Sequence, residues 1–317
     1  MGKPFCYGHK IVLGALLLLG FLLVGCRQAT PLSTAIVETE SAIRTEEVVI
    51  AGTEAASGES SGDENPLPAD PIAMNFTTRD GVELEGTFYP AAVNNAPVIV
   101  LMHWALGDQS DWRAIAAWLQ NRGLAVEPGG ADEPWLDPSW FPVFADEYTF
   151  NVFTFTFRGC DGGCKTFDRE GWRLDVEAAM TEVVRMESIN RSEVLTIGAS
   201  IGADGVAYGC HNYNNQLGGC QGAFSLSPGG YLEIPYAQEV ANLEAELIGR
   251  PAWALYAESD TESAAASREA IGSLYRAVEY SGSLHGMQLI NPDQDPNPLD
   301  LILEFIHDYL ECDICSL

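Results

Sequence analysis

The chain is poor in positive charge. Its 317 residues include 16 lysines and arginines against 45 aspartates and glutamates, which gives a net charge of −29 at neutral pH. A surface with this balance repels the phosphates of nucleic acids and the headgroups of anionic lipids. The composition therefore argues against nucleic acid as a partner, and a highly anionic substrate would have to overcome the same repulsion.

The amino-terminal apolar run is too short for a comfortable membrane span. It covers residues 11–24, follows a short basic region with Lys3 and Lys10, and ends at Leu23-Val24-Gly25-Cys26. This ending resembles the lipobox of bacterial lipoproteins, in which cleavage before the cysteine exposes its thiol for lipid attachment. We predict a signal peptide over residues 1–25, lipidation of Cys26, and a lipid-anchored, extracytoplasmic protein of the cell envelope. An uncleaved anchor and a plain secretory signal are the alternatives.

Residues 26–70 contain no aromatic side chain. The segment is acidic and rich in serine, threonine and glutamate, so it cannot bury enough apolar area to offset its conformational entropy. We predict a disordered tether here, between the lipid and a catalytic domain over residues 71–317.

The cysteines lack the repeated spacing and the nearby histidines of a zinc site. Cys6 falls in the predicted signal peptide and Cys26 at the predicted lipid site, which leaves six cysteines. Sequence alone leaves their pairing open, but their clustering favours three local disulfides: Cys160 with Cys164, Cys210 with Cys220, and Cys312 with Cys315. Disulfides fit an oxidising location. We predict no metal site and no cofactor.

The most informative motif is Gly-Ala-Ser-Ile-Gly at residues 198–202, a G-x-S-x-G pattern. It directly follows the apolar run 194–197 and precedes a stretch that can open a helix. A serine on such a strand-to-helix turn is held exposed at the carboxyl end of a sheet, with the next backbone N–H beside it at a helix start. The context predicts Ser200 as a nucleophile and the Ile201 N–H as an oxyanion donor. An ordinary serine in a glycine-rich turn is the alternative.

Three histidines follow Ser200. His211 falls on the helix that Ser200 opens, and His307 lies in a closing segment with helical apolar spacing. His285 sits in a loop of small residues after a strand-like segment, where a general base is needed. We therefore predict His285 as the base.

The acid of such a site should follow another strand, between Ser200 and His285 in the chain. Residues 252–257 form a strand-like apolar run, and Glu258-Ser259-Asp260 comes next. We favour Asp260 over Glu258 because the loop position past the strand faces the histidine, and the role of Asp260 would be to fix the imidazole tautomer. The choice between the two acids stays open from sequence.

A second oxyanion donor is expected after an earlier strand. Residues 98–102 are a continuous apolar run, typical of a strand buried on both faces, and His103-Trp104-Ala105-Leu106-Gly107 follows. This loop resembles the H-G-x-x-G loop of α/β-hydrolases with Trp104 in place of glycine. The match assigns the donor to the Ala105 N–H, and His103 is predicted to be structural.

Together these segments resemble the α/β-hydrolase superfamily, with an esterase-like or dienelactone-hydrolase-like site. Residues 78–90 look like the family's opening hairpin, and residues 151–159 are similar to its strand that ends in Arg-Gly. The resemblance implies an α/β-hydrolase fold: a mostly parallel central sheet with helices on both faces. It also implies cleavage of a small-molecule carboxylic ester through an acyl-enzyme on Ser200. A peptidase or thioesterase of this fold, and a non-catalytic surface-binding lipoprotein, are the alternatives.

Alternating apolar patterns predict the remaining elements, including helices over residues 236–248 and 263–274. The segment 127–148 is dense in proline and aromatic residues, which indicates an ordered loop. It could form either a wall of the substrate pocket or a buried support.

Overall fold

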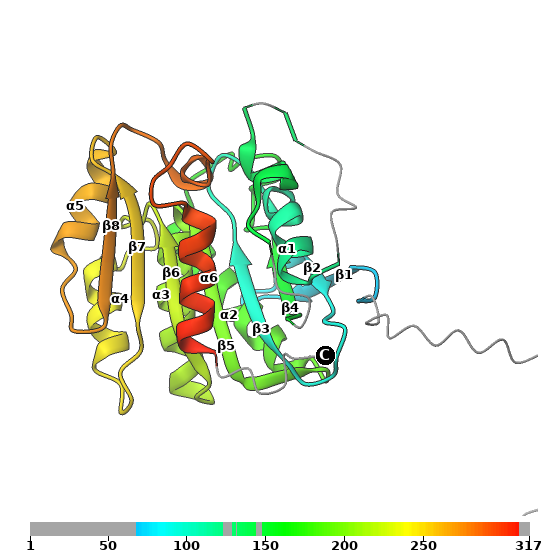
Figure 1. The fold of residues 1–317 in the computed structure, drawn as a ribbon. Coiled ribbons are helices and arrows are strands. Elements are labelled where there is room, and N and C mark those ends of the chain that lie inside the picture. The colour runs from blue at the N-terminus through cyan, green and yellow to red at the C-terminus, as the bar shows by residue number, and fades with distance from the viewer. Residues whose placement is uncertain (1–67, 123–128, 131, 144–147, 311–317) are drawn as a thin grey trace, which may run out of the picture. The chain divides into compact units, whose positions relative to one another are not determined.

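The computed structural model describes residues 68–122, 129–130, 132–143 and 148–310. Its centre is an eight-stranded sheet with the strand order β1-β2-β4-β3-β5-β6-β7-β8 (Figure 1). All pairs from β4 to β8 are parallel, and β2 alone runs against the other strands. The strands are β1 (Ile72–Thr77), β2 (Glu83–Tyr89), β3 (Ala96–Met102), β4 (Asn151–Phe155), β5 (Ile189–Ala199), β6 (Cys220–Leu226), β7 (Ala252–Ala257) and β8 (Tyr275–Tyr280).

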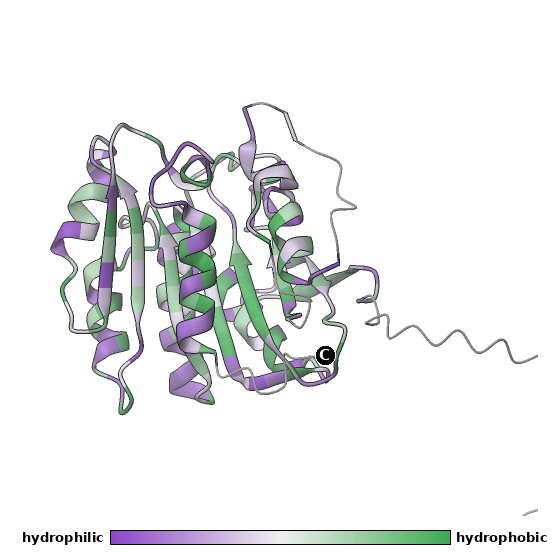
Figure 2. Ribbon diagram, viewed as in Figure 1, coloured by the Kyte–Doolittle hydropathy of each residue, from purple (hydrophilic) through white to green (hydrophobic). Residues whose placement is uncertain are grey.

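The central strands are buried on both faces of the sheet. Every residue of β3 is buried. Val98 and Val100 belong to the hydrophobic core on one face, and Ile99 and Leu101 belong to the core on the other. Two-sided burial explains why this strand is continuously apolar instead of alternating, and Figure 2 shows β3 green along most of its length.

Helices cover both faces. The first core receives side chains from α2, α3 and α4 and is contacted by α5, whereas the second receives side chains from α1 and α6. This arrangement confirms the expected fold class. The helices are α1 (Arg113–Leu119), α2 (Arg169–Arg185), α3 (Ile201–Gln216), α4 (Tyr236–Glu244), α5 (Thr261–Glu269) and α6 (Pro298–Tyr309).

Two helices are shorter at their carboxyl ends than the apolar spacing predicts. Helix α4 ends at Glu244 instead of residue 248, and α5 ends at Glu269 instead of residue 274. The two ends meet each other. The backbone N–H and hydroxyl of Ser273 both donate to Glu244 Oε1, at 2.6 and 2.5 Å. The Ser273 N–H thus donates to Glu244 instead of continuing the helix that the apolar spacing predicted to residue 274.

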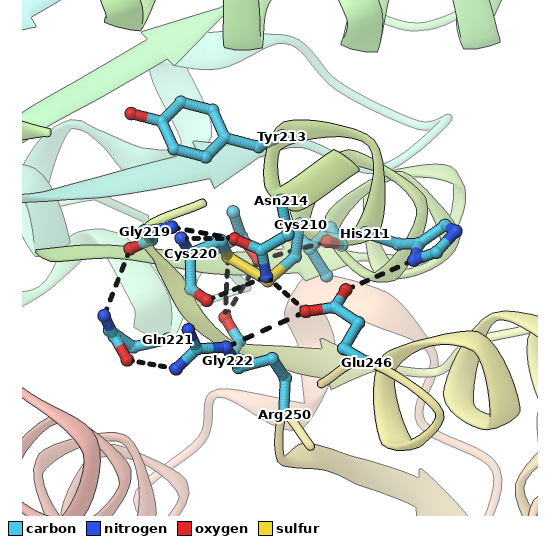
Figure 3. Close-up of a disulfide and its surroundings, with 12 residues drawn as sticks. Cys210, His211, Tyr213, Asn214, Gly219, Cys220, Gln221, Gly222, Glu246 and Arg250 are labelled. Carbon is cyan, nitrogen blue, oxygen red and sulfur yellow. Dashed lines mark hydrogen bonds and ion pairs between the residues drawn. A yellow bond between two sulfur atoms is a disulfide. The ribbon is translucent and has the colours of Figure 1, made fainter. Parts of the chain in front are cut away.

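Two of the three predicted disulfides lie in the described residues, and both are present. One joins Cys160 to Cys164. The other joins Cys210 on α3 to Cys220 at the start of β6, and Figure 3 shows it beside a network that includes Asn214 and Glu246.

Several predictions fall outside the described residues. They are the signal peptide, most of the tether, the lipidation site Cys26 and the pair Cys312 and Cys315. Within the part of the chain that the structure describes, no helix combines the length and the hydrophobicity needed to cross a membrane.

Candidate active site

Ser200 lies at a strained turn between β5 and α3. Its backbone has φ 53° and ψ −114°, a left-handed conformation that non-glycine residues rarely adopt. The residue is only 3% exposed, and its N–H donates to the Leu226 carbonyl of the neighbouring strand at 2.8 Å. Strain of this kind at a strand-to-helix turn is the geometry expected of a nucleophile elbow.

The two glycines of the motif are required by close backbone approach. A Cβ on Gly198 would lie 2.2 Å from the Gly202 carbonyl oxygen. A Cβ on Gly202 would lie 2.2 Å from the carbonyl oxygen of Met102, the last residue of β3. The start of α3 therefore packs directly against the β3 loop, which we define as residues 103–108.

His285 reaches Ser200 from the loop after β8. Its Nε2 lies 2.8 Å from Ser200 Oγ. On the other side of the ring, Nδ1 lies 2.6 Å from Asp260 Oδ2. A carboxylate oxygen can only accept a hydrogen bond, so Nδ1 must carry the proton that it donates to Asp260. Nε2 is then free of a proton and accepts from the Ser200 hydroxyl. The structure thus brings the three predicted side chains into one hydrogen-bonded chain.

Asp260, not Glu258, contacts the histidine. Asp260 follows β7 and precedes the first residue of α5, and its side chain is 12% exposed. The Glu258 side chain instead accepts from the Gly282 N–H at 3.5 Å. Glu258, which is nearer to the strand end, therefore points to the Gly282 backbone. Asp260, which is next to the helix start, turns toward His285.

The two predicted oxyanion donors lie on adjoining segments. Ile201 is the first residue of α3, so its N–H has no acceptor within the helix. Ala105 lies in the β3 loop, against which Gly202 packs. The positive end of the α3 dipole adds to the preference of this place for negative charge.

His103 is a structural residue beneath the β3 loop, as predicted. It is fully buried, and burial lowers the pKa of its imidazole to about 4. The Phe157 N–H donates to Nε2 at 2.9 Å, which leaves Nδ1–H to donate to the Trp104 carbonyl at 2.6 Å. A neutral ring with one donor and one acceptor thus satisfies two backbone groups.

Trp104 stands where the family pattern has glycine. Its indole Nε1 donates to Asp111 Oδ2 at 2.7 Å, and burial raises the pKa of that carboxyl. The indole ring packs edge-on against Trp135, with centroids 5.6 Å apart. Trp135 belongs to the proline-rich segment, whose described part therefore acts as a buried support for this loop.

A second layer of residues behind His285 was not predicted. Ser227 Oγ accepts from the Gly286 N–H at 2.9 Å, and the Tyr231 ring lies edge-on to the imidazole at 6.3 Å. Asp204, one turn after Ser200 on α3, accepts from the N–H groups of Gly229 and Tyr231 at 2.8 and 2.5 Å. The sequence gives one indication of this role: Asp204 stands four residues after Ser200, which is one helical turn.

The other two histidines lie on helices, as predicted. His211 on α3 places Nδ1 3.2 Å from Glu246 Oε1. His307 on α6 has a side chain that is 82% exposed. In the part of the chain that the structure describes, the only histidine that contacts Ser200 is His285.

Solved structures share this architecture. The hyperthermophilic esterase of Pyrobaculum calidifontis has a TM-score of 0.53 at 14% identity, covering 77% of this chain and 87% of that one. A thermostable carboxylesterase from a metagenomic library has a TM-score of 0.52 at 16% identity, covering 78% and 91%. The acetyl xylan esterase of Paenibacillus sp. R4 has a TM-score of 0.52 at 13% identity, covering 76% and 84%. These likenesses show that the chain has the α/β-hydrolase fold.

Sequence similarity is more limited. No protein-family model matches the chain. The uncharacterized protein YfhR of Salmonella typhi is 27% identical over 161 residues, which are 48% of this chain and 48% of that protein. YfhR of Escherichia coli strain K12 is 28% identical over 137 residues, 43% of this chain and 40% of that protein. The match therefore spans less than half the length of these relatives.

Proposed function

We propose that this protein is a serine hydrolase that cleaves carboxylic esters through an acyl-enzyme on Ser200. The observation that carries the proposal is the hydrogen-bonded chain from Asp260 through His285 to Ser200, with contacts of 2.6 and 2.8 Å. The esterases among the structural neighbours support the choice of an ester over other acyl substrates.

In the acylation step Ser200 Oγ attacks the carbonyl carbon of the ester, and His285 Nε2 takes the hydroxyl proton. Asp260 stabilises the imidazolium that results. The carbonyl oxygen becomes an oxyanion, held by the N–H groups of Ile201 and Ala105, and each such donor contributes about 3 kcal/mol to the transition state. Collapse of the intermediate expels the alcohol, which receives the proton from His285.

Deacylation repeats these steps with water as the nucleophile. His285 Nε2 removes a proton from the water as its oxygen attacks the acyl carbon, and the same donors hold the second oxyanion. The proton then returns to Ser200 Oγ, and the carboxylic acid leaves.

Labelling with a fluorophosphonate tests the nucleophile. We expect the full-length chain to be labelled, and the Ser200→Ala variant to lose both labelling and ester hydrolysis while its melting temperature stays within a few degrees. Labelling that persists in the variant would place the nucleophile elsewhere. A well-folded wild type with neither labelling nor turnover would favour the non-catalytic alternative.

We further propose that the enzyme is a lipoprotein of the cell envelope, held by lipid on Cys26. The lipobox-like sequence supports this, and so do the two disulfides of the described residues, because such bonds persist in oxidising compartments. Expressed in a bacterium, the wild type should fractionate with membranes and the Cys26→Ala variant should not. Equal fractionation of the two would refute lipid anchoring at this residue.

A further inference from the structure

We propose that the Cys160–Cys164 disulfide positions the second oxyanion donor, the N–H of Ala105. This inference rests on the proposed function and goes beyond it, because the disulfide touches neither Ser200 nor His285. The argument concerns two segments. One is the β3 loop, and the other is the disulfide loop, which we define as residues 159–164.

On the carboxyl-terminal side of Ala105, the β3 loop has little side-chain packing. Leu106, the residue after Ala105, is 69% exposed. Hydrogen bonds to the backbone therefore carry the positioning of Ala105 on this side. Because a peptide group is planar and trans, fixing a carbonyl also fixes the N–H of the next residue.

Both peptide groups that flank the Ala105 Cα are fixed. The Trp104 carbonyl, which shares a plane with the Ala105 N–H, accepts from His103 Nδ1 at 2.6 Å. The Ala105 carbonyl, in the following plane, accepts from the Cys164 N–H at 2.8 Å. The first bond sets the direction of the Ala105 N–H, and the second, which comes from the disulfide loop, holds Ala105 in place from its carbonyl side.

The disulfide loop makes one further hydrogen bond to the β3 loop. The Gly162 N–H donates to Asp108 Oδ2 at 2.9 Å. Gly163 also approaches closely, since a Cβ at this residue would lie 3.2 Å from the Leu106 carbonyl oxygen. The loop is thus apposed to the β3 loop from Ala105 to Asp108.

Without a crosslink this loop would have access to many backbone conformations. Three of its six residues, Gly159, Gly162 and Gly163, are glycines with φ of 71°, 59° and 107°. Glycine loses more conformational freedom on ordering than other residues. The bond between Cys160 and Cys164 closes the loop around two of these glycines, so it restricts the segment that supplies the Cys164 N–H.

The test compares two double variants of the full-length chain. Cys160→Ser with Cys164→Ser opens the disulfide loop and keeps the backbone N–H of residue 164. Cys210→Ser with Cys220→Ser is the matched control, because it removes the other disulfide, which joins α3 to the start of β6 (Figure 3). We expect the first variant to lose about 10- to 100-fold in kcat at nearly unchanged KM, part of the loss that follows removal of a whole donor. The control should keep the wild-type kcat.

A transition-state analogue separates positioning from general loosening. A trifluoromethyl ketone accepts Ser200 Oγ at its carbonyl carbon, His285 takes the hydroxyl proton, and the resulting oxyanion needs the same donors. Its affinity should fall in the first variant by the same factor as kcat/KM. Gly163→Ala is a second variant that keeps the disulfide, and it should show the same loss because alanine is strained at φ 107°.

Two outcomes overturn the inference. If the wild type is active while the Cys160/Cys164 and Gly163 variants keep its kcat and its inhibitor affinity, the disulfide loop has no positioning role and the proposed function stands. If the wild type is neither labelled at Ser200 nor active on esters, the proposed function fails and this inference fails with it.

Discussion

At the scale of single residues, the glycine two positions after Ser200 illustrates how tightly the turn is packed. A Cβ on Gly202 would meet two backbone oxygens, those of Met102 at 2.2 Å and His103 at 2.7 Å. Neither can move without shifting the end of β3. We expect Gly202→Ala to lower the unfolding free energy by about 3 kcal/mol or more, as measured by urea denaturation.

Gly230→Ala provides the comparison for this substitution. Nothing lies within 4 Å of a Cβ at Gly230, so its unfolding free energy should change by less than about 0.5 kcal/mol. Equal stability of the two alanine variants would contradict the packing argument for the motif.

The acid beside His285 gives a second prediction at this scale. Asp260→Asn keeps the size of the side chain but can present an amide N–H to Nδ1, which favours the wrong imidazole tautomer. We expect kcat for ester hydrolysis to fall by about 10⁴-fold with little change in melting temperature. Glu258→Gln is the control and should keep most of the activity, because Glu258 contacts Gly282 and not His285. The reverse result would move the acid to Glu258.

At the scale of elements, α3 connects the nucleophile to the loop behind His285. Its Asp204 is 2% exposed and holds residues 229 and 231 through two backbone hydrogen bonds. Burial nevertheless raises the pKa of this carboxyl from 3.8 to about 7. A folded-state pKa above the unfolded one means that the folded protein binds more protons between these two values.

This shift predicts a pH dependence of stability. The unfolding free energy should fall as pH rises from about 4 to about 7, by up to about 4 kcal/mol from this group. Asp204→Asn removes the titration. The variant should be less stable overall, since an amide cannot accept on both of its polar atoms, but its stability should fall less steeply across this window. Urea denaturation at several pH values measures both slopes, and parallel curves would contradict the assignment.

At the scale of the whole molecule, the excess of acidic residues acts on any charged substrate. With a net charge of −29, the field around the protein should lower the encounter rate of anionic esters. Screening shortens this field, so kcat/KM for 4-nitrophenyl hemisuccinate should rise several-fold between about 10 mM and about 300 mM salt. The neutral 4-nitrophenyl acetate should change little. Identical salt dependence of the two esters would show that the surface charge does not reach the site.

Much of the site could be predicted because its serine and histidine lie in recognisable local sequence patterns. The G-x-S-x-G turn after an apolar run indicated Ser200, and the small-residue loop indicated His285; the structure places the two in contact at 2.8 Å. The disulfide between Cys160 and Cys164 followed from their short separation. Such features depend on residues near one another in the chain, and so a sequence can show them.

Other features depend on contacts between distant segments. The choice of Asp260 over Glu258, the hydrogen bond from Gly286 to Ser227, and the early ends of α4 and α5 are examples. In each case the sequence offered two or more groups that could make the same contact or hydrogen bond. Tertiary packing selected among them.

The sequence by itself determined the alternation of strands and helices, the identity of the serine and histidine, and the acidic character of the chain, because periodicity, residue type and charge need no partner. Only the tertiary structure decided which acid meets His285 and which backbone groups orient the Ala105 N–H. The first decision depends on the contact between Asp260 and His285. The second depends on contacts between residues 103–108 and 159–164, which lie over 50 residues apart in the chain. Their hydrogen bonds exist only once the sheet has brought the two segments together.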